Sequence, residues 1–181
     1  MKVIISILIF SISFCQGVLY MDLGLMPKGE IEVSMMGLNI SESEDLESGS
    51  VSIGYYHPVY QVSDKMGISV VGSYEVVPAS DEDVEFGFMA LYGALGYSLS
   101  DQLSAWGSLG ISVPTTEDFK DVDAETGMHM GLGVSYSIND QIGASLGYVL
   151  NSTEYDMSAD GMSASVDMTF SKIILSLGYK L

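Results

Sequence analysis

Alternation of apolar residues with small or polar ones is the strongest pattern in this chain. Residues 127–138 place Met, Leu, Val, Tyr and Ile on one face, and Gly, Ser and His129 on the other. Residues 142–151 follow the same rule. A period of two over such lengths predicts β-strands with two unlike faces. After residue 17 the chain has no run of about 18 apolar residues, so the pattern predicts no transmembrane helix.

Three similar short turns interrupt these strands at nearly equal intervals. A tyrosine lies four residues before the aspartate of each turn, in the pairs Tyr60 and Asp64, Tyr97 and Asp101, and Tyr136 and Asp140. Ser-Asp and Asn-Asp suit tight turns because their side chains bond nearby backbone groups. Residues 27–29, Pro-Lys-Gly, are interpreted as a fourth turn at the same end.

The predicted fold class is all-β. Longer acidic segments at residues 41–49, 78–84, 115–126 and 153–161 alternate with the short turns, an asymmetry typical of transmembrane barrels. We therefore predict an eight-stranded antiparallel up-and-down transmembrane β-barrel over residues 29–181, with short periplasmic turns and longer acidic extracellular loops. Its strands are predicted at residues 30–40, 50–62, 67–77, 85–99, 103–113, 127–138, 142–152 and 163–181. Residues 18–28 are assigned to an N-terminal lead-in, although residues 18–26 also alternate and form either that lead-in or part of a strand.

The polar face distinguishes a membrane barrel from a water-soluble one. A soluble barrel points its apolar face inward and covers its outside with solvating charged residues. In this chain the second face is mainly Gly and Ser, and the charged residues gather in the loops. Such faces suit lipid outside and a narrow polar lumen inside. With eight strands, side chains just fill the interior, so we expect a narrow small-solute channel at most.

The first 17 residues have the features of a secretory signal peptide, with Lys2 followed by a short apolar run. Cleavage after Cys15 or after Gly17 would leave a mature chain without cysteine. Lipidation at Cys15 is the disfavoured alternative, because Phe14 is bulky. The chain has 24 acidic residues, 6 lysines and no arginine, for a net charge of −18. This charge argues against nucleic acid as a partner.

Apolar residues alternate to the end of the chain, at Ile173, Leu175, Leu177, Tyr179 and Leu181. This C-terminus resembles that of small bacterial outer-membrane β-barrel families: the outer-membrane protein A transmembrane domain, its X-type relative and the opacity-type proteins. It implies localisation in the bacterial outer membrane and contact with its lipid. It also implies handling by periplasmic chaperones and by the barrel-assembly machinery, which reads the C-terminal segment as an assembly signal. The chain departs from the usual terminal Phe or Trp by ending in Leu181.

Candidate functional residues fall into three sets. An interfacial girdle, with buried rings and wet hydroxyls, is predicted from Tyr60, Tyr97, Tyr136 and Tyr179. A luminal polar cluster is predicted from Glu75, His129 and Lys172. These residues occupy inward-facing positions of their strands, at similar distances from the nearest short turn or from the C-terminus. The alternative is three separately solvated residues. Divalent cations are candidate partners at two acidic runs, Glu42, Glu44, Asp45 and Glu47, and Glu117, Asp118, Asp121, Asp123 and Glu125. Neither run has the spacing of an EF-hand loop.

The sequence contains no recognised catalytic or cofactor motif, so we expect a structural or surface-interaction role and no cofactor. An outer-membrane lipid hydrolase or acyltransferase is the alternative, with His57 and His129 as the histidines that could serve as bases.

The alternation also predicts the direction of individual side chains, because odd and even positions of a strand face opposite sides. Residues predicted to face lipid are Leu132, Val134, Leu146, Tyr148, Leu175 and Leu177; those predicted to face inward are His129, Ser135, Ser145, Lys172, Ser176 and Trp106. Parity changes around Pro58 and over residues 86–92, where bulges are expected.

Overall fold

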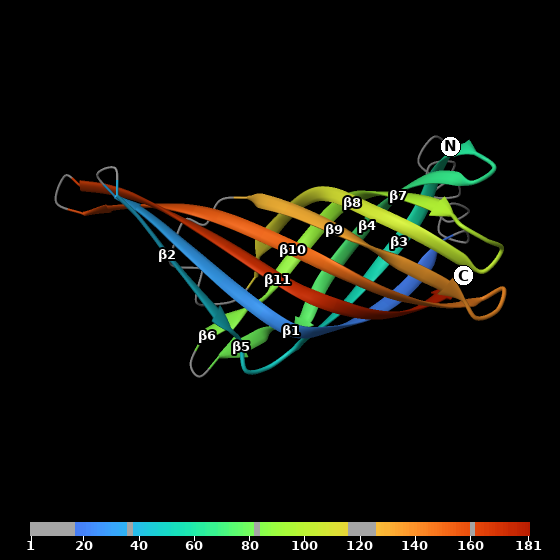
Figure 1. The fold of residues 1–181 in the computed structure, drawn as a ribbon, viewed down its shortest axis with the longest axis horizontal. Helices are drawn as coiled ribbons and strands as arrows, with labels where there is room; N and C mark the ends of the chain where they lie inside the picture. Colours follow the sequence, from blue (N-terminus) through green and yellow to red (C-terminus); the bar gives the residue numbers. More distant parts are fainter. Residues whose placement is uncertain (1–16, 36–37, 82–83, 116–125, 160–161) are drawn as a thin grey trace, which may run out of the picture.

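The computed structural model describes residues 17–35, 38–81, 84–115, 126–159 and 162–181, and these form strands and short connections without a helix (Figure 1). Within these ranges, no helix is long and apolar enough to cross a membrane. The strands are β1 (Val18–Met35), β2 (Leu38–Asp45), β3 (Ser50–Ser63), β4 (Met66–Val77), β5 (Ala79–Asp81), β6 (Val84–Phe86), β7 (Phe88–Ser98), β8 (Leu103–Pro114), β9 (Gly127–Ser137), β10 (Ile142–Ala159) and β11 (Met162–Lys180). The signal peptide predicted at residues 1–17 lies, apart from Gly17, outside the described residues.

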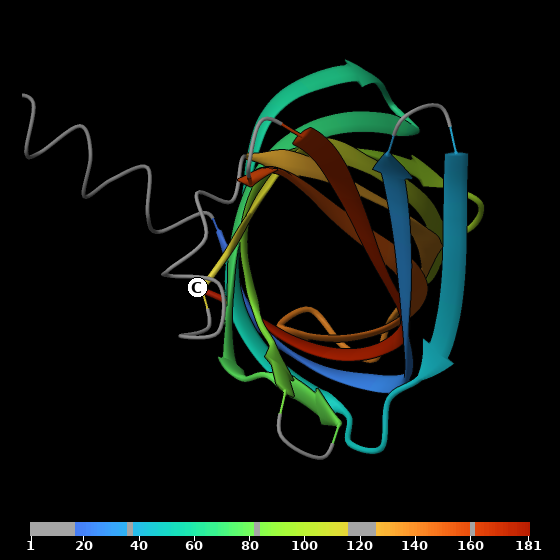
Figure 2. The same ribbon diagram turned by 90° about the vertical axis from the view of Figure 1, so that its left-hand side faces the viewer.

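Eight of the described strands close into a barrel. They follow the order β11-β10-β9-β8-β7-β4-β3-β1, every neighbouring pair is antiparallel, and β1 pairs with β11 to complete the ring. The end view in Figure 2 shows this ring of strands. Closure removes the free sheet edges that would leave backbone groups unpaired in lipid. The predicted all-β, eight-stranded, up-and-down barrel is therefore confirmed.

The first predicted strand, residues 30–40, is wrong. β1 begins at Val18 and ends at Met35, and β2 begins at Leu38, so residues 18–28 belong to the barrel wall and are not a lead-in. Pro27 to Gly29 lie within β1 and form no fourth turn. The reason is a bulge: the register with β11 shifts between Leu25 and Lys28, and Met26 has a φ of 50°. Because a bulge inserts one unpaired residue, the strand continues with its faces exchanged.

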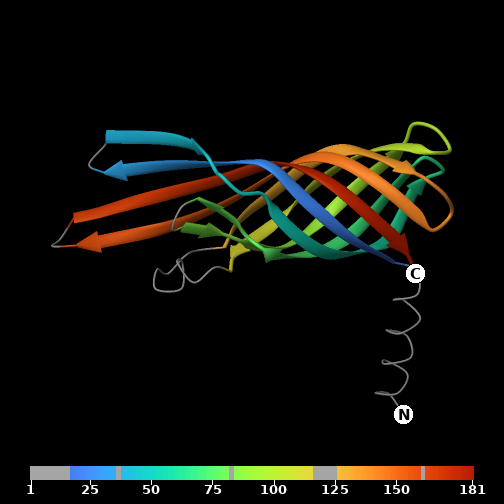
Figure 3. The same ribbon diagram turned by 90° about the horizontal axis from the view of Figure 1, so that it is seen from below.

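The three predicted short turns are confirmed, and in each of them the side chain of the residue before the aspartate accepts a hydrogen bond from the nearby backbone. Asn139 Oδ1 accepts hydrogen bonds from the backbone N–H of Gln141 at 2.9 Å and of Ile142 at 2.8 Å. Ser100 Oγ accepts one from the backbone N–H of Leu103 at 3.0 Å. All three turns lie at the barrel end that also holds the C-terminus (Figure 3). We call it the short-turn end.

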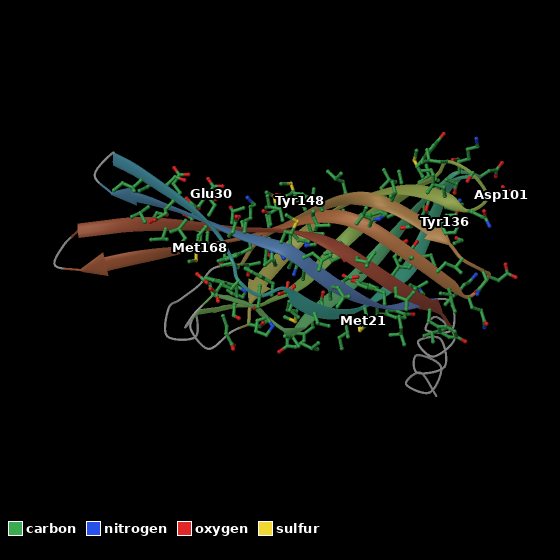
Figure 4. The ribbon with its side chains drawn as sticks, turned by 60° about the horizontal axis from the view of Figure 1, so that its bottom comes forward. Met21, Glu30, Asp101, Tyr136, Tyr148 and Met168 are labelled. Carbon is green, nitrogen blue, oxygen red and sulfur yellow. The ribbon has the colours of Figure 1, made fainter. Side chains whose placement is uncertain are left out.

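The outer face of the barrel is apolar, as the alternation predicted. Large side chains with 43–64% of their surface exposed cover it, including Leu132, Val134, Leu146, Tyr148, Leu175 and Leu177. Figure 4 shows Met21 and Tyr148 on this outer surface. Such an apolar surface is stable when it faces hydrocarbon rather than water. The predicted orientation of these side chains is confirmed.

The two predicted changes of parity have different outcomes. Around Pro58 the register of β3 with β4 shifts between Pro58 and Tyr60, so a bulge is present there. Over residues 86–92 the expected bulge is absent from the described strands: β7 pairs with β8 without a shift, and Phe88 and Tyr92 point inward. Large aromatic residues in the lumen had obscured the regular alternation of this strand.

Three strands extend beyond the barrel on the side opposite the short turns. β1, β10 and β11 have 18, 18 and 19 residues, whereas crossing a membrane takes about 9–11. Their outer halves and β2 pair in the order β10-β11-β1-β2, formed by residues 151–159, 162–170, 28–35 and 38–45. We call this four-stranded sheet the ribbon; it projects from the barrel in Figures 1 and 3.

Candidate functional site

A buried ion pair crosses the lumen in the half of the barrel nearer the ribbon. Lys172 on β11 donates through Nζ to Glu75 Oε1 on β4, and to Ser50 Oγ on β3 at 2.9 Å. The side chains of Lys172 and Glu75 are only 11% and 6% exposed. Gly24 on β1 makes room for this connection, since a Cβ there would lie 2.8 Å from Lys172 Cδ. β11 and β4 are separated by two strands, so the pair ties distant walls of the barrel together.

His129 belongs to a separate network. Its Nδ1 donates to Asn151 Oδ1 at 2.8 Å, which leaves Nε2 to accept from the Ser108 hydroxyl at 3.2 Å. Tyr92 stacks on the imidazole with ring centroids 4.0 Å apart. The predicted luminal cluster is thus only partly assembled: Glu75 and Lys172 bind each other, and His129 binds other residues. The alternative of three separately solvated residues is wrong, since all three are buried.

Asn151 and Ser108 were missed in the sequence, although a signal for Asn151 was present. His129 and Asn151 lie at equal distances on either side of Asp140. Hairpin pairing across that turn therefore places them opposite each other, and the register confirms this pair. Ser108 lies two residues after Trp106 on β8 and so shares its inward direction, but position along a strand identifies no partner.

Two further contacts brace the lumen. The Trp106 indole Nε1 on β8 donates to Ser145 Oγ on β10 at 2.9 Å, which confirms the inward direction of both residues. The hydroxyls of Tyr20 on β1 and Tyr92 on β7 are 2.9 Å apart. Contacts between non-adjacent strands at several levels leave little space for an open passage.

Aromatic side chains cover the mouth of the lumen on the ribbon side. Phe86, Phe88 and Phe170 are all buried; the Phe170 ring centroid lies 4.4 Å from that of Phe86 and 5.3 Å from that of Phe88. β7 and β11 stand on opposite sides of the ring. Val166 and Met168 extend this buried cluster along the ribbon. An apolar plug therefore separates the polar lumen from the ribbon side.

The short-turn end is hollow. A cavity of about 380 Å³ opens there, between the β9–β10 turn, the start of β1 at Val18 and the end of β11 at Lys180. Its lining includes Asp22, Tyr56, Tyr92, Trp106, Ser135 and Ser176. Lys172, Glu75 and His129 are not among its lining residues. We call this cavity the cup.

The ribbon has two unlike faces. Val33, Val166 and Met168 lie on the face that continues the lumen, and Met168 is labelled in Figure 4. The opposite face carries a row of acids: Asp167 on β11 is paired in register with Glu32 on β1 and with Glu154 on β10. Like charges directly opposite each other on a sheet are unfavourable. The row therefore lowers the stability of the ribbon, and the pairing of its strands does not need acidic side chains at these positions.

The predicted girdle residues lie where parity placed them. Tyr60, Tyr97, Tyr136 and Tyr179 are on the outer face, 43–66% exposed, and Figure 4 shows Tyr136 near Asp101 at the short-turn end. The outer face of β11 likewise carries Ile173, Leu175, Leu177 and Tyr179 in alternation, and Leu181, one residue past its end, is also exposed. Roles in anchoring and in assembly stay predictions for both sets.

The acidic runs proposed for cations are described only in part. Glu117, Asp118, Asp121, Asp123 and Glu125 lie outside the described residues. In the other run, Asp45 forms an exposed ion pair with Lys28 at 2.9 Å. No group of three His, Cys, Asp or Glu side chains in the described part of the chain is arranged to hold a metal ion. Cation binding at these runs stays a prediction.

No family model and no curated protein matches the sequence. Solved structures match over most of the chain. The outer membrane protein OprG from Pseudomonas aeruginosa is 13% identical, with a TM-score of 0.50 over 93% of this chain and 98% of OprG. Ail of Yersinia pestis is 13% identical over 88% of this chain and 99% of Ail, with a TM-score of 0.41. Neisserial surface protein A is 9% identical over 90% and 97%, with a TM-score of 0.43.

At these identities the similarity to OprG concerns the fold. The ring of eight antiparallel strands supplies the same architecture from this chain's own pairing, and the exposed apolar side chains supply a surface that requires hydrocarbon. The protein therefore has the fold of the small outer-membrane β-barrels, with an apolar outer surface that suits lipid.

Proposed function

We propose that this protein is a surface-interaction barrel whose contact surface is the acidic face of the ribbon, and that its partner is positively charged. The observation that carries the proposal is the row of Glu32, Asp167 and Glu154, which projects beyond the membrane-spanning band. β1, β10 and β11 are each longer than the strand length needed to cross a bilayer by about eight residues, or roughly 25 Å.

The charge of the ribbon supports a basic partner. The ribbon contains five acids in residues 28–45 and three in residues 151–159 and 162–170, against the single Lys28. Lys28 is already paired with Asp45. Glu30 and Glu154 accept hydrogen bonds from Ser41 and Ser165 and keep their charges unpaired. A basic partner would relieve the repulsion within the row and would be attracted from a distance.

An octalysine peptide is a suitable probe, titrated against the protein in phospholipid nanodiscs. The triple variant Glu32→Gln, Glu154→Gln, Asp167→Asn should bind it at least several-fold more weakly than the unmodified protein, and added salt should weaken binding further. The matched control removes three charges at the other end: Asp64→Asn, Asp101→Asn, Asp140→Asn. Equal losses in the two triple variants would contradict the proposal, because net charge alone would then explain binding.

Acyl hydrolysis is a second candidate, because Ser108, His129 and Asn151 are connected as a nucleophile, a base and the group that orients the base. His129 is only 5% exposed and none of the three residues lines the cup. These features support a bracing role, and we propose that the protein is not an enzyme. Hydrolysis of a p-nitrophenyl ester should be no faster with the unmodified protein than with Ser108→Ala. A rate that falls in this variant would favour the hydrolase.

The outward alternation of the last strand supports a further proposal, that the assembly machinery reads this segment. Leu177→Ser would interrupt the alternation of apolar side chains in an otherwise intact strand. It should reduce the amount of folded barrel in the outer membrane more than Leu132→Ser, the same change on β9. Folded barrel is measured by its heat-modifiable migration on a denaturing gel. Equal reductions would mean that only the loss of lipid contact matters.

A further inference from the structure

The cup contains one buried acid whose bonding is incomplete. Asp22 on β1 lines the cup and is only 6% exposed. Ser176 hydrogen-bonds to its carboxyl group, whereas the other oxygen, Oδ1, has no hydrogen-bond partner. A buried carboxylate oxygen without a donor is costly, since it has left water without a replacement.

The surrounding charges compensate Asp22 only in part. Lys172 and Glu75 are the charged side chains whose fields act on it, and these two bind each other. This part of the lumen therefore holds two carboxyl groups and one ammonium group. At the cavity mouth, Lys180 and Asp140 supply opposite charges that are both exposed to solvent. A cation in the cup would balance the remaining negative charge.

The rest of the lining also suits an organic cation. Tyr56, Tyr92 and Trp106 contribute aromatic rings, whose faces attract ammonium groups. The indole of Trp106 is held in place by its bond to Ser145. The cavity volume of about 380 Å³ lies within the range of small-molecule pockets, about 300–1,000 Å³. It is too large for a bare metal ion and suits a molecule of about ten non-hydrogen atoms.

We propose that the cup binds a small organic cation that carries a primary ammonium group, with Asp22 as the acceptor and the aromatic rings around the cation. The ammonium group supplies the N–H donor that Oδ1 lacks, and rotation about the terminal torsion of Asp22, which is soft, turns that oxygen toward the ligand. The ligand enters from the short-turn end, the periplasmic side. This site lies at the opposite end of the barrel from the ribbon and does not depend on the proposed surface interaction.

The test uses benzylammonium as the probe and benzyl alcohol as its neutral control of nearly equal shape. Trp106 is the only tryptophan in the chain, so its fluorescence reports directly on the cup. In the unmodified protein, held in detergent micelles, benzylammonium should give a saturable change in this signal. Because a hydrogen bond to a charged group is lost, Asp22→Asn should weaken binding by roughly tenfold or more. Asp101→Asn, an exposed turn acid, should leave it unchanged.

Each outcome decides the proposal. Loss of binding in Asp22→Asn alone, in protein that retains heat-modifiable migration, supports it. Equal binding by the alcohol would show that the cup recognises the ring without its charge, and would overturn it. No saturable change in the unmodified protein, or equal binding by both variants, would overturn it as well, and Asp22 would then simply be a protonated acid in the wall.

Discussion

Replacing one member of the Lys172 and Glu75 pair should destabilise the barrel more than replacing both. Lys172→Met leaves the carboxyl of Glu75 in a buried lumen without its cation, and it removes the donor to Ser50 Oγ. Glu75→Met leaves the ammonium group of Lys172 with Ser50 Oγ as its hydrogen-bond acceptor among the described residues. The double variant removes both charges and retains apolar side chains of similar length.

The size of the effect follows from burial. The two side chains are 11% and 6% exposed, and removing one partner of a buried pair costs about 3–5 kcal/mol. Replacing both partners with apolar residues of similar volume is often close to neutral. We therefore expect each single variant to lose about 3–5 kcal/mol of unfolding free energy, and the double variant to lose less than either.

Urea titration of protein folded into phospholipid vesicles measures these differences, with the folded fraction read from heat-modifiable migration. Lys28→Met is the matched control, because its ion pair with Asp45 has a similar form but its side chains are 56% and 79% exposed. Exposed pairs contribute little, so we expect no measurable change. The reasoning is refuted if Lys172→Met is as harmless as Lys28→Met, or if the double variant loses as much as the two single variants together.

Three further predictions concern the wall and the lumen. Leu146→Lys puts a charge on the lipid face and should cost about 2–4 kcal/mol, whereas Ser135→Lys points into the cup and should fold with much less loss in the same urea titration; equal losses would mean that the two faces are misassigned. Gly147→Ala should destabilise by about 1–3 kcal/mol, since a Cβ there would lie 2.5 Å from the Trp106 ring. Gly72→Ala, where no atom lies within 4 Å of such a Cβ, should be neutral, and a similar loss at both glycines would contradict the packing explanation. Conductance measurements in planar bilayers should show no wide, stable open state, because the aromatic plug and the bonds across the lumen fill the half of the barrel nearer the ribbon.

Several features of this protein could be predicted because they depend on local periodicity. The alternation in residues 127–138 and 142–151 determined which side chains face lipid, since a strand turns successive side chains to opposite faces. The Ser-Asp and Asn-Asp turns located three hairpins through side chains that bond the adjacent backbone, as Asn139 does. Neither feature requires knowledge of distant parts of the chain.

The first strand illustrates what periodicity cannot supply. Pro27, Lys28 and Gly29 have the composition of a turn, yet they lie inside β1 because β11, about 150 residues away, pairs with the chain on both sides of the bulge at Met26. The barrel must also close between its first and last strands, and this requirement recruits residues 18–24. A non-local pairing therefore overrode a local turn signal.

The lumen shows the same division. Parity correctly turned Glu75, His129 and Lys172 inward, because direction depends only on position along a strand. Their height and their partners depend on the stagger between strands, and this joined Lys172 to Glu75 and His129 to Asn151. The sequence by itself thus determined the barrel, its two faces and its short turns; the tertiary structure alone decided the ribbon, the cross-lumen pairs and the cup, because each arises where residues distant in sequence meet across a closed ring.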